Sequence, residues 1–114
     1  MIASILTTID HKIYFSYSII RRGKMQMTRR HIVFKGSVQG VGFRWRAEHA
    51  AGRFGCTGWC RNEWDGSVVM EIQGTEPQID QVILALEHGT FIQIESMEVK
   101  DVPLEEREYG FRTE

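Results

Sequence analysis

Two segments of this chain repeat apolar residues with the period of an α-helix, and each is flanked by segments rich in strand-forming residues. In both helical segments the apolar residues recur at i, i+3, i+4 and i+7, which places them on one face. They are Ala47, Ala50, Ala51 and Phe54 in the first segment, and Ile79, Val82, Ile83 and Leu86 in the second. The spacing predicts a helix over 44–54 that ends at Gly55. It predicts a second helix that begins in a capping box of Thr75 and Gln78 and ends at Gly89.

Five further segments carry the β-branched and aromatic residues that strands prefer. They span residues 31–35, 56–62, 67–74, 91–99 and 109–113. Asp65-Gly66, between the second and third of them, is a strong hairpin signal. The order is β-α-β-β-α-β with a terminal strand, which is the split β-α-β arrangement of the ferredoxin-like fold. We therefore predict an α+β sandwich in which two helices cover one face of an antiparallel sheet.

The first 27 residues differ from the rest of the chain. An apolar run at 13–20 is followed by basic residues, and Met25 and Met27 stand just before the first predicted strand. We expect residues 1–27 to be an extension and residues 28–114 to form one domain, because the chain is too short for two. A true start of translation at Met25 or Met27 is the expected explanation. A disordered tail and an added strand are the alternatives.

Charge is distributed unevenly along the chain. Residues 1–30 carry six basic residues and one acidic residue, whereas residues 31–114 carry 8 basic and 14 acidic residues. An acidic body argues against binding to duplex nucleic acid, which normally requires a broad basic face. No run of about 18 apolar residues is present, so no membrane span is expected. The acidic run at 105–108 is expected to lie on a solvated surface.

The two cysteines, Cys56 and Cys60, are expected to be free and to fill core or half-buried positions. Nothing in the first residues has the basic region of a secretory signal, so we expect a cytoplasmic protein with reduced thiols. Two cysteines four residues apart, with no second pair, are a weak metal signal. A disulfide between them is the minor alternative.

The most informative stretch is Gly-Ser-Val-Gln-Gly-Val-Gly-Phe-Arg at residues 36–44, which joins a predicted strand to a predicted helix. Gly40 and Gly42 allow backbone angles and a close approach that a Cβ would block. Backbone N–H groups and the helix N-terminus can then converge on one anion. Arg44 can bind the same anion with two hydrogen bonds. The pattern indicates a phosphate site; a tight turn with a solvated Arg44 is the alternative.

Asn62, at the end of the second predicted strand, is the other candidate. Its uncharged amide both donates and accepts hydrogen bonds, so it can orient a water molecule. The alternative is an asparagine that only starts the turn at 63–66. Trp64, two residues further on, is a candidate to border the same site.

Taken together, these segments resemble the acylphosphatase family. The resemblance rests on Gly36-x-Val38-Gln39-Gly40-Val41-Gly42-Phe43-Arg44, on Gly58-Trp59-x-Arg61-Asn62, on Asp65-Gly66-x-Val68 and on Gly74. The motifs are in the family's order and spacing and cover about residues 29–113. Ser37 stands where the family usually has Arg, and Cys56 and Cys60 replace aliphatic residues. None of these departures touches the two catalytic positions.

The resemblance implies an enzyme that hydrolyses acyl phosphates to a carboxylate and inorganic phosphate. It implies that Arg44 binds the phosphate, that Asn62 holds the attacking water and that the loop 38–44 cradles the phosphoryl group. The expected backbone donors of that loop are Gln39, Gly40, Val41, Gly42 and Phe43. No metal, cofactor or covalent enzyme intermediate is expected. The expected partner is the small-molecule substrate, with no nucleic acid and no membrane, and we expect a monomer.

Three other functions are weighed against this one. The domain could be a non-catalytic module for anions or partners on the same fold, although the presence of both Arg44 and Asn62 argues against it. It could be a carbamoyl-phosphate-handling domain of the kind found in larger maturation proteins, which the short chain disfavours. It could be a ferredoxin-like RNA binder, which would need exposed aromatic residues on a basic sheet.

Overall fold

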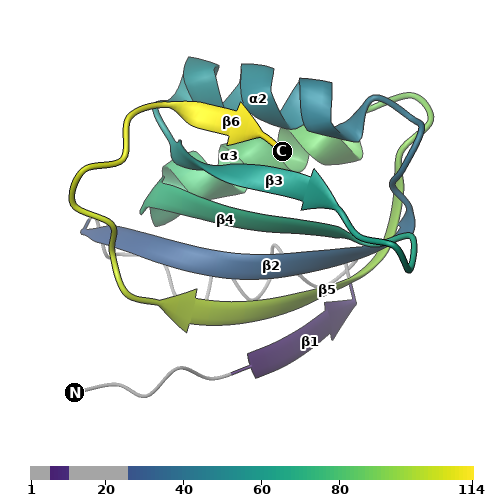
Figure 1. Cartoon of the computed structure of the whole chain (residues 1–114), viewed down its shortest axis with the longest axis horizontal. Helices are drawn as coiled ribbons and strands as arrows, with labels where there is room; N and C mark the ends of the chain where they lie inside the picture. The colour runs from purple at the N-terminus through teal and green to yellow at the C-terminus, as the bar shows by residue number, and fades with distance from the viewer. Residues whose placement is uncertain (1–5, 11–25) are drawn as a thin grey trace.

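In the computed structural model, the described residues form one β-sheet that is covered on one face by two helices (Figure 1). The structure describes the backbone of residues 6–10, and residues 26–114 with their side chains. The strands are β1 (Leu6–Asp10), β2 (Met27–Ser37), β3 (Thr57–Asn62), β4 (Val68–Thr75), β5 (Gln93–Val102) and β6 (Phe111–Thr113). The helices are α2 (Phe43–Phe54) and α3 (Glu76–Glu87). This is the predicted α+β sandwich, with its strands in the order β1-β5-β2-β4-β3-β6.

Among the described strands, the sheet is antiparallel at every pair but one. β2 pairs antiparallel with β4 and β5, β4 with β3, and β5 with β1. β6 instead runs parallel to β3. The connection 103–110 stays at one end of the sheet while it crosses to the far edge, so β6 starts from the end at which β3 starts (Figure 1). The expected antiparallel sheet therefore has one parallel pair at its edge.

The core lies between the helices and the sheet, and both predicted helix faces point into it. Seven of the eight predicted positions are buried, and Phe54 packs against the core from a half-buried position. From the sheet, the buried set includes Ile32, Phe34, Met70, Ile72 and Met97. Cys56 and Cys60 are buried there as free thiols, as expected.

The helix ends follow the predicted signals closely. α3 begins with a capping box in which the Thr75 side chain accepts from the Gln78 backbone and the Gln78 side chain accepts from the Thr75 backbone. Gly55 caps the end of α2 in a left-handed conformation. β2 begins four residues before its predicted start. The prediction missed this part of the strand because it contains Arg29 and Arg30, which are buried despite their charge. Charged residues at the start of a strand hide it from a pattern of apolar residues.

Arg29 forms a buried ionic cluster where the loop 103–110 crosses the sheet. Its side chain is 2% exposed; Nε donates to Glu71 at 2.9 Å, and Nη1 and Nη2 donate to Glu108 at 2.7 and 3.1 Å. Burial alone would raise the pKa of Glu108, but the hydrogen bonds and positive charge of Arg29 outweigh it and hold that pKa below its ordinary value. The expected solvated surface is wrong for Glu108, whose side chain is only 9% exposed.

Part of the expected N-terminal extension is described, and part is not. Residues 6–10 form β1, which extends the sheet beyond β5. Residues 1–5 and 11–25 lie outside the described residues. The expected start at Met25 or Met27 stays a prediction. In the part of the chain that is described, neither helix has the length and apolar character needed to cross a membrane.

Candidate active site

The glycine-rich loop between β2 and α2 opens on a cavity of about 200 Å³. Gly40 and Gly42 both have left-handed backbone conformations, with φ of 73° and 81°. A Cβ built on either glycine meets nothing within 4 Å, so the loop needs these glycines for their backbone angles and not for space. The residues that line the cavity are Val38, Gly40, Gly42, Phe43, Arg44, Trp45 and Asn62.

The N-terminus of α2 lies at this cavity and has no capping side chain. Its N-cap is Gly42, and no acidic residue stands in its first turn. The first N–H groups of a helix lack partners within the helix and carry a partial positive charge. α3, by contrast, has a complete capping box and Glu76 in its first turn. Of the two helices, α2 is therefore the one whose N-terminus is open to an anionic ligand.

Arg44 is the second residue of α2 and adds a full positive charge to the same cavity. Its side chain is half-buried, and Nη1 donates a 3.0 Å hydrogen bond to the backbone carbonyl of Glu114. That carbonyl follows β6, so the edge strand steadies the guanidinium. The guanidinium has five N–H donors in all, which leaves others available for an anion.

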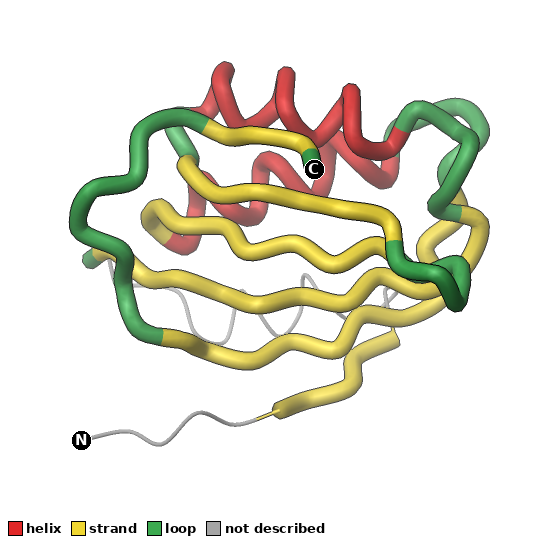
Figure 2. Tube along the Cα trace, in the orientation of Figure 1, coloured by secondary structure: helices red, strands yellow, loops and turns green. Residues whose placement is uncertain are grey.

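Asn62 enters the cavity from the other side, at the end of β3. The turn after it is tight: Glu63 N–H donates to the Ser67 carbonyl, and Asp65 accepts from both the backbone and the hydroxyl of Ser67. Those two hydrogen bonds hold the pKa of Asp65 below its ordinary value. The β2–α2 loop and the β3–β4 turn lie at the same end of the sheet (Figure 2).

Gln39 links the two halves of the site. Its side-chain Nε2 donates to the Glu63 carbonyl at 2.6 Å and to the Ser67 carbonyl at 2.8 Å. The glycine loop is thereby tied to the turn that follows Asn62. The sequence indicated Gln39 only as a backbone donor, and neither Gln39 nor Val41 is among the residues that line the cavity.

The structure therefore brings five of the seven predicted site residues to one cavity: Gly40, Gly42, Phe43, Arg44 and Asn62. Trp64, the candidate to border the site, does not line the cavity and is 97% exposed. Trp45 lines the cavity instead, although no sequence pattern marked it as a site residue.

The thiols of Cys56 and Cys60 have low reactivity. Burial raises the pKa of both Cys56 and Cys60 to about 12. Cys56 directly precedes β3 and Cys60 lies within it. Four residues of extended chain span about 13 Å, whereas a disulfide requires Cα atoms about 4.4–6.8 Å apart. The backbone thus disfavours the disulfide that was weighed as the minor alternative.

Comparisons with known proteins point to one family. The family model described as Acylphosphatase matches residues 30–113. A protein named acylphosphatase from Geobacillus kaustophilus is 38% identical over 86 residues, which are 73% of this chain and 92% of that protein. Another from Oceanobacillus iheyensis is 44% identical over 70 residues, covering 60% of this chain and 77% of that protein.

Solved structures show the same likeness. An acylphosphatase from Bacillus subtilis superposes with a TM-score of 0.69 at 27% identity, covering 77% of this chain and 98% of that one. The structure of full-length HypF also matches, with a TM-score of 0.66 at 26% identity, but the match covers only 12% of that chain and 81% of this one. A chain matched by this family model over residues 30–113, and by such relatives over most of their own length, belongs to the acylphosphatase family.

Proposed function

We propose that this protein hydrolyses acyl phosphates to a carboxylate and inorganic phosphate in the cavity between the β2–α2 loop and Asn62. The observation that carries the proposal is the meeting of three features at one cavity. These are the uncapped N-terminus of α2, the guanidinium of Arg44 and the amide of Asn62. The first two favour a phosphate dianion. The third supplies a neutral group that can position water.

In the proposed reaction, the phosphoryl group lies against the loop 38–44 and the first turn of α2. Arg44 binds its oxygens and stabilises the charge that they carry in the transition state. Backbone N–H groups of Gln39, Gly40, Val41, Gly42 and Phe43 are the proposed donors of the loop. Phe43 begins α2, which supports its N–H as one of the unpaired donors of that helix.

Asn62 orients a water molecule for attack on phosphorus. The bond from phosphorus to the acyl oxygen breaks, the carboxylate leaves, and the water proton passes to a phosphate oxygen. No strong base is required, because a carboxylate is a good leaving group and positioning supplies much of the rate. The reaction as proposed needs neither a metal ion nor a covalent enzyme intermediate.

We further propose that residues 28–114 form the catalytic domain and that it acts as a monomer in the cytoplasm. The family match over residues 30–113 supports the domain limits. The two free, buried thiols suit a reducing compartment. Light scattering coupled to size-exclusion chromatography measures the mass in solution. The mass of a dimer would contradict the proposed monomer.

The decisive experiment measures steady-state hydrolysis of benzoyl phosphate in the presence of a chelator. Arg44→Ala and Asn62→Ala should each lower kcat/KM by at least about 10²-fold, the usual cost of losing one stabilising group. Arg53→Ala is the matched control. It lies on the same helix, is exposed and does not line the cavity, so it should keep the activity of the parent.

The opposite result is equally clear. A folded parent that does not turn over benzoyl phosphate would contradict the proposed hydrolysis. The site would then be a non-catalytic anion-binding module, and inorganic phosphate should bind to the parent more tightly than to Arg44→Ala.

A further inference from the structure

Trp45 is a large aromatic side chain at the entrance of the phosphate cavity. It directly follows Arg44 in α2, lines the cavity and is 63% exposed. Among the seven lining residues, Val38 and Phe43 are buried, two are glycines, and Arg44 and Asn62 are polar. Within this set, the indole of Trp45 supplies the accessible apolar surface.

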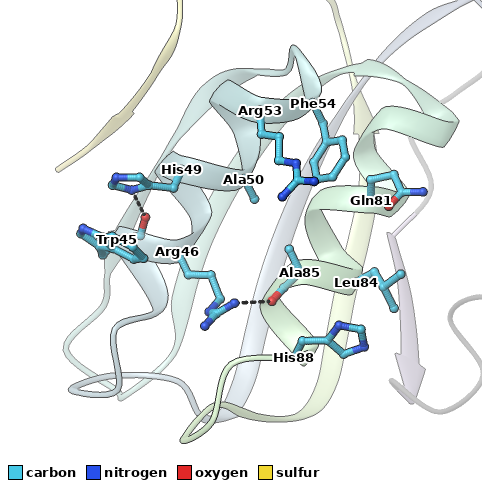
Figure 3. A pocket seen from close by; sticks show the side chains of 10 residues that line it. All are labelled: Trp45, Arg46, His49, Ala50, Arg53, Phe54, Gln81, Leu84, Ala85 and His88. Atoms are coloured by element: carbon cyan, nitrogen blue, oxygen red, sulfur yellow. Dashed lines mark hydrogen bonds between the residues drawn. The ribbon is translucent and has the colours of Figure 1, made fainter.

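His49 holds the indole in place. The two rings stack with centroids 3.9 Å apart and an interplanar angle of 26°. Nδ1 of His49 donates to the backbone carbonyl of Trp45 at 2.8 Å. The two side chains lie side by side on α2, where they also line a second pocket, of about 300 Å³, between α2 and α3 (Figure 3). Because His49 covers one face of the indole and Trp45 remains mostly exposed, part of the ring is open to a ligand.

The chemistry of an acyl phosphate gives this ring something to bind. Its phosphate binds at Arg44 and the helix N-terminus, so its acyl group must extend out of the cavity past the residues at the entrance. A flat acyl group can stack on the free face of an indole, and aromatic pairs gain stabilisation beyond that of the area that they bury. A small acyl group such as acetyl has no ring to stack.

We propose that Trp45, held by His49, binds the acyl group and makes the enzyme prefer acyl phosphates with a flat aromatic acyl group. This inference rests on the proposed hydrolysis of acyl phosphates. Trp45 is here a residue that determines specificity, since it contacts the part of the substrate that leaves and not the reacting phosphorus.

The experiment compares kcat/KM for benzoyl phosphate with kcat/KM for acetyl phosphate in the parent and in four variants. Trp45→Ala should lower the benzoyl-to-acetyl ratio about tenfold, the scale of one aromatic stacking contact. Trp45→Phe keeps a flat ring and should recover part of the preference. His49→Ala frees the indole and should lower the ratio by a smaller factor, about threefold.

Trp64→Ala is the matched control, because Trp64 is exposed and does not line the cavity. Its ratio should equal that of the parent. Far-ultraviolet circular dichroism establishes that each variant is folded before the kinetics are compared.

The outcomes separate this inference from the function on which it rests. An active parent whose ratio is the same in Trp45→Ala overturns the aromatic preference alone. The same conclusion follows if Trp45→Ala remains active but kcat/KM falls by the same factor for both substrates. A folded parent that hydrolyses neither substrate overturns the proposed hydrolysis and the preference together.

Discussion

Among single residues, Gln39 offers the sharpest test of how the two halves of the site are held together. Gln39→Ala removes both hydrogen bonds to the turn after Asn62. We expect kcat to fall about 10- to 100-fold with little change in KM, because the water-positioning amide shifts relative to the phosphate. The loss of two hydrogen bonds should also cost about 1–3 kcal/mol of unfolding free energy.

Gln39→Glu should behave like Gln39→Ala, since a carboxylate cannot donate to the two carbonyls. The control is Gln81→Ala, at an exposed position on α3. A Gln39→Ala variant with the kcat of the parent would show that the turn keeps its place without this link.

The residue patterns of the sequence indicated Arg44 and Asn62 but not this role of Gln39. Arg44 follows a glycine loop and Asn62 ends a strand, and both positions are visible as patterns. The acceptors of Gln39 are main-chain carbonyls 24 and 28 residues away. No residue type marks a carbonyl acceptor, so only the folded backbone reveals the contact. The sequence did not mark Trp45 as a site residue for a similar reason. Its exposure depends on the direction in which α2 leaves the loop.

At the scale of elements, α3 depends on its capping box. Thr75→Ala removes the side-chain oxygen that accepts from the Gln78 backbone. We expect the free energy of unfolding, measured by urea denaturation, to fall by about 1 kcal/mol. The activity should remain, because α3 begins at the end of the sheet opposite the cavity.

Thr90→Ala, at an exposed position in the turn after α3, is the control and should change stability little. Equal stability of the Thr75→Ala variant and the parent would mean that the helix start is satisfied by other groups.

The elements differed in how well the sequence predicted them. Both helices were predicted to within about a residue or two, because a repeat of 3.6 and paired end signals act together. The parallel pairing of β6 could not be predicted in this way. It depends on the end of the sheet at which the loop 103–110 crosses, and that path is held by the contact between Arg29 and Glu108, which are distant in the sequence.

For the whole molecule, the ionic cluster at Arg29 couples folding to pH. The carboxylates of Glu71 and Glu108 are partly buried, which raises their pKa, but hydrogen bonds from His31 and Arg29 outweigh burial and lower it. A lowered carboxyl pKa stabilises the fold fully above the unfolded value near 4.5. That stabilisation is lost as the pH falls through the folded pKa.

Glu108→Gln should therefore lower the free energy of unfolding by about 2 kcal/mol at pH 7, the scale of a hydrogen bond to a charged group. The difference from the parent should shrink at pH values below about 4. Urea denaturation across this range measures it. Glu106→Gln, exposed in the same loop, is the control. A difference independent of pH would contradict the ionic origin of the effect.

The arrangement of the sheet has a further consequence for how the protein behaves when it is crowded. A strand at the border of a sheet presents unpaired backbone groups that can recruit another chain and seed fibrils. Here the long strands β2, β4 and β5 all lie inside the sheet, and the borders are β1 with five residues and β6 with three. Borders this short give an incoming strand few groups to pair with. With β1 in place, the described sheet thus offers little edge for self-association, whereas a chain that starts at Met25 or Met27 would expose the ten residues of β5.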